Sequence, residues 1–462
     1  MGLTCPSVAR AQKFMTNELP YLAHSPIGQS FAEQSQDFGY LYDRGQSVAW
    51  VKSRWSVGDK GDLLLRAAIG DYCTELYLQY PKDTPRLSLL LDSRFRQGVL
   101  AEAKPHLPKW KFSEQFDQNS YLIGVPGNGV VDLRTGELRD MERTDFVTKR
   151  ARVRPESGFE PKLFLKFIDE ITDGDEELAA YLMRFCGYVL TASTKEHCLP
   201  FWWGTGANGK GTLLNVLQHI LGYEYSTTVR MSDLTRRDTG NDNQRRIIAK
   251  LCGARLVTCN EGNHNVQLDM ALLKTLASSD MLSGAHLYEN EFSFIPSHKL
   301  VIATNAKPVL ETDAAARRRV HLVPFNVSFR GRENKELEEQ LKHESPGILA
   351  VMIRSCLEWQ RLGLAPPASV TNATNDLFRE LDVIGRFMEE RLQRDPDAFT
   401  FTGDIVRAYR NFVISDDEQT HIDERKLMTE IKERGCYESG TKRNEAGLQR
   451  RGLWRVRLKD PQ

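Results

Sequence analysis

The chain has 462 residues, 40% of them hydrophobic and 27% charged, which is enough for two or three domains with sizeable cores. Its 62 basic and 62 acidic residues give zero formal net charge, which excludes polyanion binding by overall charge and leaves nucleic-acid contact to local patches. The eight cysteines form no CxxC pair, which argues against a zinc site or disulfide framework and for a reducing, intracellular compartment. No apolar run approaches the length of a bilayer span, and the N-terminus lacks a signal-peptide core.

The first part of the chain is typical of a mixed region followed by helices. The segment 124–138 reads GVPGNGVVDLRTGEL, and its two hairpin signals, Asn128-Gly129 and Thr135-Gly136, predict short strands joined by tight turns. Between residues 161 and 190 the apolar side chains instead recur at helical spacing. Asp173, Gly174 and Asp175 predict a turn between two helices there.

The stretch 201–212, FWWGTGANGKGT, carries the strongest signal of the chain. Its apolar start predicts a buried strand, and residues 213–221 predict a helix that ends at Gly222. The glycines and Lys210 match the P-loop pattern GxxxxGK[ST], in which backbone N–H groups and a helix N-terminus hold phosphate oxygens. Lys210 is expected to reach the β- and γ-phosphates. The residues expected to bind the nucleotide are Gly204, Thr205, Gly206, Ala207, Asn208, Gly209, Lys210, Gly211 and Thr212.

Gly211 departs from this pattern, because the pattern has a Ser or Thr there whose hydroxyl binds Mg²⁺. Thr212 follows at once, but one residue along a helix turns the side chain by about 100°, so Thr212 is a weak candidate metal ligand. We expect Mg²⁺ to be held through water by Glu261 together with the phosphates.

Two later strands end in polar residues. Residues 255–260 predict a strand followed by Glu261, and residues 300–304 predict a strand followed by Asn305. Ligands of α/β sheets bind at the carboxyl ends of strands. Glu261 is therefore expected to organise Mg²⁺ and activate water, and Asn305 to sense the γ-phosphate, although Asn305 taken alone fits a strand-end turn residue better.

Three consecutive arginines, Arg317–Arg319, precede a predicted strand at 320–325. Such a run fits a transition-state cation for the phosphate of a neighbouring subunit, and it fits a surface ion-pair cluster as well. Further on, residues 348–360 predict an apolar helix, 364–370 a linker, and 380–414 and 424–435 three more helices before a final LWRVRL strand. The C-terminal run from Thr441 is basic, which by itself is typical of a solvated face.

In this order, the glycine loop, Glu261, Asn305 and the arginine run before a V-P-F strand resemble superfamily 3 helicases. More narrowly, the chain is similar to the phage/plasmid primase-helicase family, which includes the poxvirus primase-helicase. The segments 124–138, 182–193, 274–280 and 292–299 also match that family. The resemblance is good over residues 120–330 and weaker over 40–120 and 380–460.

The resemblance implies an α/β fold built around an AAA+-like P-loop ATPase core. The expected domains are an N-terminal α+β region at 1–155, a helical collar at 156–198, the ATPase core at 199–330, a helical connector at 331–375 and a winged-helix-like domain at 376–462. The implied activity is ATP- and Mg²⁺-dependent DNA unwinding by a ring, usually a hexamer, in the replication of a phage or mobile element. Single-stranded DNA would occupy the channel of the ring. A separate primase or polymerase would be its partner. The protein would work in the cytoplasm, without membrane contact.

The resemblance also assigns roles to residues. Lys210 would bind phosphate, Glu261 would activate water, Asn305 would act as sensor, and Arg318, or else Arg319, would reach across the subunit boundary. Residues 282–288 and 292–300 would form a hairpin directed into the channel. Its candidate DNA contacts are His286 and Lys299, although its tip is acidic where the family has basic residues, and His286 fits a half-buried hairpin residue as well.

Two other functions remain open at this stage. Gly211 favours a nucleotide-binding DNA-associated module, such as a loader or scaffold, with weak or no unwinding. An AAA+ protein remodeller is a further alternative. The short segment before residue 120 predicts a collar or oligomerisation element and not a primase domain, because it has no convincing carboxylate constellation.

Overall fold

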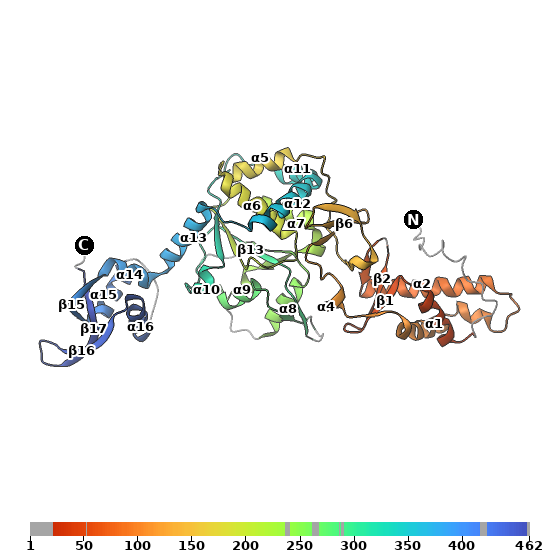
Figure 1. The fold of residues 1–462 in the computed structure, drawn as a ribbon, viewed down its shortest axis with the longest axis horizontal. Coiled ribbons are helices and arrows are strands. Elements are labelled where there is room, and N and C mark those ends of the chain that lie inside the picture. Colours follow the sequence, from red (N-terminus) through yellow and green to blue (C-terminus); the bar gives the residue numbers. More distant parts are fainter. Residues whose placement is uncertain are drawn as a thin grey trace.

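The fold is that of a computed structural model, which describes residues 22–51, 53–235, 241–260, 268–285, 287, 291–415 and 423–459. The molecule is elongated (Figure 1), with the N-terminal region at one end, a central α/β unit and a C-terminal unit at the other end. Helix α13 (Ala368–Leu381) leads from the central unit to the C-terminal unit. Among the described helices, none has both the length and the apolar composition of a membrane span.

The N-terminal region contains two small sheets. Three helices pack beside a four-stranded sheet of order β3-β2-β1-β4, and their apolar faces share one core around Ile27, Leu65 and Val99. The elements are α1 (His24–Gln34), β1 (Phe38–Leu41), β2 (Gln46–Trp50), β3 (Trp55–Val57), α2 (Asp59–Gln79), α3 (Ser93–Ala103), β4 (Lys109–Trp110) and α4 (Phe112–Gln115). Short 3-10 helices cover Leu87–Leu91, Lys104–His106 and Arg143–Asp145.

The strands predicted within 124–138 are confirmed. β5 (Leu122–Val125), β6 (Gly129–Asp132) and β7 (Glu137–Asp140) form an antiparallel three-stranded sheet. Asn128 at φ 60° and Gly136 at φ 79° adopt the left-handed conformation that tight turns require.

The predicted helix pair is also confirmed, as α5 (Lys162–Ile171) and α6 (Glu176–Val189). Asp175 caps α6 by accepting a hydrogen bond from the backbone N–H of Leu178 at 3.0 Å. Two later helices, α11 (Leu337–His343) and α12 (Ser345–Leu362), join the same layer. The contact is close: a Cβ on Gly187 of α6 would lie 2.3 Å from the backbone nitrogen of Cys356 in α12.

A five-stranded sheet occupies the centre, in the order β14-β8-β13-β10-β9 with every pair parallel. Its strands are β8 (Leu199–Trp203), β9 (Ser226–Arg230), β10 (Leu256–Asn260), β13 (Lys299–Thr304) and β14 (Val320–Pro324). The predicted strands of this unit are confirmed, whereas β9 was not predicted. Near-continuous apolar runs fit a parallel sheet because both of its faces are buried.

Helices cover both faces of this sheet. On one face, Trp202 and Val323 pack in a core with α6, α12 and α7 (Lys210–Tyr225). Helix α7 was predicted to end at Gly222; it is interrupted there but continues to Tyr225. On the other face, Phe201 and Leu322 pack with α8 (Asn241–Leu251), α9 (Met270–Leu276), the short α10 (Ala314–Arg317) and α13. A 3-10 helix covers Met231–Asp233.

The C-terminal unit has its own core, which includes Phe387, Ile405, Leu427 and Val456. Its three predicted helices are confirmed as α14 (Val383–Arg391), α15 (Thr402–Ser415) and α16 (Glu424–Gly435). The strands β15 (Leu392–Phe401), β16 (Glu438–Arg443) and β17 (Gln449–Leu458) form a sheet of order β15-β17-β16, of which only β17 was predicted. The predicted linker 364–370 is too long, because α13 begins at Ala368.

Two histidines, the buried His298 and the half-buried His321, make the stability of the fold depend on pH. Burial lowers the pKa of His298, before β13, and of His321, in β14, to about 4. Because this folded pKa lies below the ordinary value of 6.5, the stabilisation is complete above pH 6.5 and is lost as the pH falls towards 4. Each histidine should contribute about 3 kcal/mol over that window. Urea unfolding at a series of pH values should show that the free energy of unfolding decreases as the pH falls from 6.5 to 4. This decrease should be smaller in His298→Gln and in His321→Gln. The same pH dependence in the variants as in the wild type would contradict the prediction.

Candidate nucleotide-binding site

The glycine loop, residues 204–209, connects β8 to α7 at the carboxyl edge of the central sheet. Its glycines are required by their surroundings. A Cβ on Gly204 would lie 2.3 Å from the carbonyl oxygen of Phe325, and one on Gly209, at φ 84°, would lie 2.5 Å from Cγ2 of Ile171. Gly206 at φ 97° and Ala207 at φ 49° also have positive φ, so the loop curls tightly, and the N–H of Gly206 donates to the Gly204 carbonyl oxygen at 2.9 Å.

Lys210 is the first residue of α7, and its side chain is directed back into the loop. The residue is only 5% exposed. Its Nζ donates to the carbonyl oxygen of Gly204 at 2.8 Å, to Oδ1 of Asn208 at 2.9 Å and to Oδ1 of Asn305 at 3.3 Å. The structure therefore brings together Lys210 and Asn305, which lie 95 residues apart in the chain.

Asn208 has a role that the sequence analysis missed. Besides accepting from Lys210, it donates from Nδ2 to the carbonyl oxygen of Phe325 at 3.2 Å, and it is 4% exposed. The backbone N–H of Phe329 donates to the Ala207 carbonyl oxygen at 2.6 Å. Asn208 thus ties the loop to the end of β14. The available signal was a polar residue in a turn between two buried elements.

The remaining residues of the loop differ in exposure. Thr205 and Gly211 are exposed, and Thr212 is half-buried. A Cβ built on Gly211 would meet no atom within 4 Å. Position 211 therefore has room for the hydroxyl side chain that the P-loop pattern expects.

Glu261 follows β10 directly but lies outside the described residues, as does His286. β10 pairs in parallel with β13, so the two strands end at the same edge of the sheet. The two arms of the predicted hairpin are confirmed in part, since β11 (Leu282–Gly284) pairs with β12 (Phe292–Phe294) in antiparallel register.

The prediction that Lys299 contacts DNA is wrong. Lys299 begins β13 and does not belong to the hairpin; it is 3% exposed and lies at the amino edge of the sheet, away from the glycine loop. Its Nζ donates to the carbonyl oxygens of Thr191 and, at 3.3 Å, of Ser297, and it lies 4.5 Å from the centre of the Tyr188 ring. Burial lowers the pKa of Lys299 well below its ordinary range. The Lys299 side chain is therefore buried, and it holds the chain that follows α6.

The arginine run also lies at the amino edge of the sheet, because it immediately precedes β14. Arg317 and Arg318 are exposed, and the Arg317 guanidinium lies 5.0 Å from the centre of the Phe378 ring. Arg319 donates from Nη1 to the Ala315 carbonyl oxygen at 3.1 Å. The backbone N–H of Arg318 donates to the Ala314 carbonyl oxygen at 3.3 Å, whereas its side chain makes no hydrogen bond or ion pair within the part of the chain that the structure describes. The length of β14 separates all three arginines from the glycine loop of the same chain.

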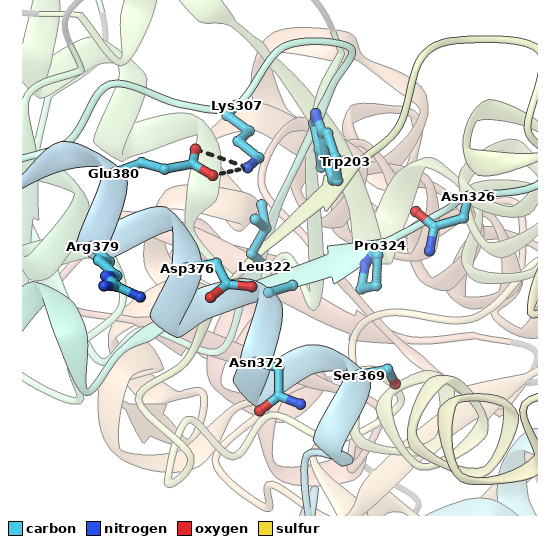
Figure 2. Close-up of a pocket in the computed structure, with 11 residues that line it drawn as sticks. Trp203, Lys307, Leu322, Pro324, Asn326, Ser369, Asn372, Asp376, Arg379 and Glu380 are labelled. Carbon is cyan, nitrogen blue, oxygen red and sulfur yellow. Dashed lines mark hydrogen bonds and ion pairs between the residues drawn. The ribbon is translucent and has the colours of Figure 1, made fainter. Parts of the chain in front are cut away.

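A groove of about 540 Å³ lies between the strands β8 and β14 and helix α13 (Figure 2). Trp203, Leu322 and Pro324 line it from the strands. Across it, Nζ of Lys307 pairs with Oε1 of Glu380 in α13 at 2.6 Å. Since Lys307 follows Asn305 by two residues, this ion pair connects the end of β13 to the helix that leads to the C-terminal unit.

No group of three or more His, Cys, Asp or Glu side chains with the arrangement of a metal site occurs in the described ranges. The site therefore consists of a glycine loop, a buried lysine and a strand-end asparagine. These features define a mixed α/β protein whose central sheet carries a glycine loop with a buried lysine at its carboxyl edge, the edge at which α/β sheets place ligands.

Comparison with known proteins gives the family. A family model described as "D5 N terminal like" matches residues 30–173, and a model of a family of unknown function, DUF5906, matches residues 202–319. This pair of regions is the signature of phage and viral primase-helicase proteins, and the chain carries both regions. The expected resemblance is confirmed.

Curated relatives come from large DNA viruses. The chain is 24% identical over 335 residues to a putative helicase of Acanthamoeba polyphaga mimivirus, covering 67% of this chain and 34% of the relative. It is 22% identical over 353 residues to a putative primase of African swine fever virus, covering 70% of this chain and 36% of the relative. The chain thus spans about a third of the length of these relatives.

A solved structure, the apo C-terminal region of NrS-1, shares the fold. It superposes with a TM-score of 0.50 at 12% sequence identity, covering 91% of this chain and 97% of that chain. This likeness concerns the fold alone.

Proposed function

We propose that the protein is an ATP-dependent DNA helicase or translocase of superfamily 3 with an AAA+-like core. The observation that carries the proposal is the contact of Lys210 with Asn305 at the carboxyl edge of the sheet. The parallel order β14-β8-β13-β10-β9 supports it, because it places the glycine-loop strand β8 beside β13, whose end bears the polar sensor candidate.

In this proposal the loop and Lys210 hold the phosphates of ATP. The curled backbone offers N–H groups to phosphate oxygens, and the N-terminus of α7 adds a favourable dipole. Asn305 already contacts Lys210, so it would also contact a γ-phosphate bound at Lys210. A shift of Asn305 on binding or hydrolysis would then move Lys307, which is paired with Glu380 of α13. Glu261, next after β10, would activate the attacking water.

Magnesium would complete the site through Glu261 and water, with Thr212 as a further weak ligand. A bound Mg²⁺ neutralises phosphate charge during phosphoryl transfer. The residues present fit this cofactor less fully than a standard P-loop, because position 211 supplies no hydroxyl.

The position of the arginines supports a ring. Arg318 is exposed, lies at the opposite edge of the sheet and cannot reach the glycine loop of its own chain. A head-to-tail arrangement of subunits would bring it, or Arg319, to the loop of a neighbour, which is how rings close. We infer a homo-hexamer around single-stranded DNA, working with a separate primase or polymerase.

The C-terminal unit supports a DNA-associated role. Its succession α14-β15-α15-α16-β16-β17, with the sheet order β15-β17-β16, supports the winged-helix-like fold expected from the sequence. Because the formal net charge of the chain is zero, DNA contact depends on local basic surfaces.

Strand displacement and DNA-stimulated ATP hydrolysis by the wild-type chain test the proposal. Hydrolysis should rise with single-stranded DNA, and displacement should require ATP and fail with a non-hydrolysable analogue. Rings should be visible by electron microscopy with nucleotide. ATP binding without turnover on any DNA would overturn the motor and favour a loader or scaffold.

Gly211 is the observation that favours this second function. Because a side chain fits at position 211, Gly211→Ser should fold normally and place a hydroxyl at the usual Mg²⁺ position. We expect tighter Mg²⁺-dependent ATP binding, by about three- to tenfold, as for one added polar interaction of roughly 1 kcal/mol. Titration with a fluorescent ATP analogue at varied Mg²⁺ measures the change, with Gly211→Ala as control. Equal affinities in all three proteins would show that this position does not meet the metal.

A further inference from the structure

The β16–β17 hairpin concentrates positive charge at its tip. The cations there are Lys442, Arg443, Arg450 and Arg451, all exposed. In the antiparallel register, Lys442 lies directly opposite Arg450. Like charges in directly opposite positions destabilise a strand pair. The pairing of Lys442 with Arg450 therefore does not stabilise the folded hairpin.

Other cations of the same unit have acidic partners, whereas these do not. Arg455 pairs with Glu438 at 3.3 Å, and Arg457 pairs with Asp395 at 2.8 Å. Within the described part of the chain, no carboxylate forms an ion pair with any of the four tip cations. The positive charge of the tip therefore remains available to an outside anion.

The tip also has a defined shape. The backbone N–H of Asn444 donates to the Leu448 carbonyl oxygen at 3.0 Å, and the N–H of Leu448 donates to Oδ1 of Asn444 at 2.9 Å. Gly447, at φ 76°, supplies the left-handed turn residue. The four cations therefore lie on an ordered two-stranded hairpin.

Both faces of this ribbon are basic. Because side chains alternate along a strand, Lys442 and Arg450 share one face, and Arg443 and Arg451 lie on the other. A flat anionic surface would meet only one face. A ribbon inserted into a groove of duplex DNA meets a phosphate backbone on each side, and a groove admits a two-stranded ribbon.

Helix α16 adds exposed cations directly before the hairpin in the chain. Leu427 and Ile431 face the core, whereas Arg425, Lys426 and Lys432 are exposed. In Figure 1 the hairpin lies at the end of the molecule, away from the central sheet. This surface is therefore separate from the glycine loop.

We propose that the β16–β17 hairpin is a duplex-DNA-binding element that contacts phosphates from both of its faces. Single-stranded DNA fits less well, because binding of unpaired bases uses aromatic stacking platforms and residues 441–451 contain no aromatic side chain. The nearby aromatics Phe399 and Trp454 instead pack on each other, with ring centres 4.7 Å apart. The proposal goes beyond the proposed motor, since it assigns a second DNA form to a different unit.

The test measures DNA binding by the full chain without ATP, so it does not depend on hydrolysis. The hairpin variant combines Lys442→Gln, Arg443→Gln, Arg450→Gln and Arg451→Gln. We expect its affinity for a labelled blunt duplex to fall by tenfold or more, and the slope of log affinity against log salt to become shallower by about 3 to 4, as for four lost phosphate contacts. Thermal unfolding should show no loss of stability, because the variant removes a like-charge pair.

A matched control changes the net charge equally elsewhere. It combines Arg134→Gln, Lys162→Gln, Lys166→Gln and Arg407→Gln, whose side chains are exposed and ion-paired. Duplex affinity close to wild type in this control supports the proposal. Unchanged duplex affinity in the hairpin variant would overturn it. So would a loss confined to a single-stranded oligonucleotide or to vesicles of phosphatidylcholine and phosphatidylserine. If the wild type had no ATPase activity, the proposed helicase function would fail, but the measured duplex binding by the hairpin would still stand.

Discussion

Replacing Arg318 by alanine should abolish most ATP turnover while leaving ATP binding nearly unchanged. The side chain is exposed and lies at the amino edge of the sheet, so it is far from its own glycine loop but available to a neighbour's loop. An arginine supplied in this way stabilises the charge that develops on the transferred phosphoryl group, and its loss lowers the turnover rate by about 10³- to 10⁵-fold. Steady-state ATPase rates and binding of a fluorescent ATP analogue measure the two effects separately.

Arg317→Ala is the matched control, because Arg317 is adjacent and exposed but packs over Phe378. It should retain much more activity than Arg318→Ala. Mixing Arg318→Ala subunits with Lys210→Ala subunits gives a sharper result. Where sites form between subunits of a ring, about a quarter of the interfaces in a random mixture are complete, so activity should reappear. Failure of the mixture to exceed both single variants would contradict a site shared between subunits.

Lys210→Ala should remove nucleotide-dependent activity by a different route. Its ammonium is buried and directed into the loop by Gly204, Asn208 and Asn305. Removing one preorganised charge of this kind from a phosphoryl-transfer site lowers turnover by about 10²- to 10³-fold. In contrast to Arg318→Ala, ATP binding should weaken as well, because Lys210 would contact the phosphates in the ground state. Isothermal titration with ATP together with ATPase rates measures both.

Lys210→Arg controls for the buried charge. It retains the cation but places a larger, forked group where an ammonium fits, so binding should recover more than turnover. Melting temperatures of both variants identify any loss of folding. If Lys210→Ala bound ATP and hydrolysed it at the wild-type rate, phosphate would not bind at this loop, and the proposed function would fail.

The central elements were predictable because their signals are local. A strand of apolar residues, a glycine turn and an amphipathic helix are short-range patterns, and β8, the loop and α7 appear where the sequence placed them. β10 and β13 were predictable for the same reason. The strands β9, β15 and β16 were missed. Their burial patterns are mixed or exposed, so they lack the apolar run that identifies an inner strand.

Lys299 shows where local patterns mislead. The sequence allowed the second hairpin arm to continue to Leu300, and a lysine on such an arm suggested DNA contact. In the fold the arm ends at Phe294, and Lys299 is drawn into the interior by carbonyl oxygens that follow α6. Nothing near Lys299 in sequence identifies Thr191 as its partner, because the two residues are 108 positions apart.

The sequence by itself determined the chemistry that the protein can offer: a glycine loop with its lysine, polar residues after two buried strands, and an arginine run before a third. Those features depend on residue type and neighbours along the chain. Only the tertiary structure decided which of them meet. Parallel pairing of β8 with β13 brought Asn305 to Lys210, whereas the direction of β14 carried the arginines to the far edge. The reason is that strand order and direction are set by packing between distant segments, which no local pattern records.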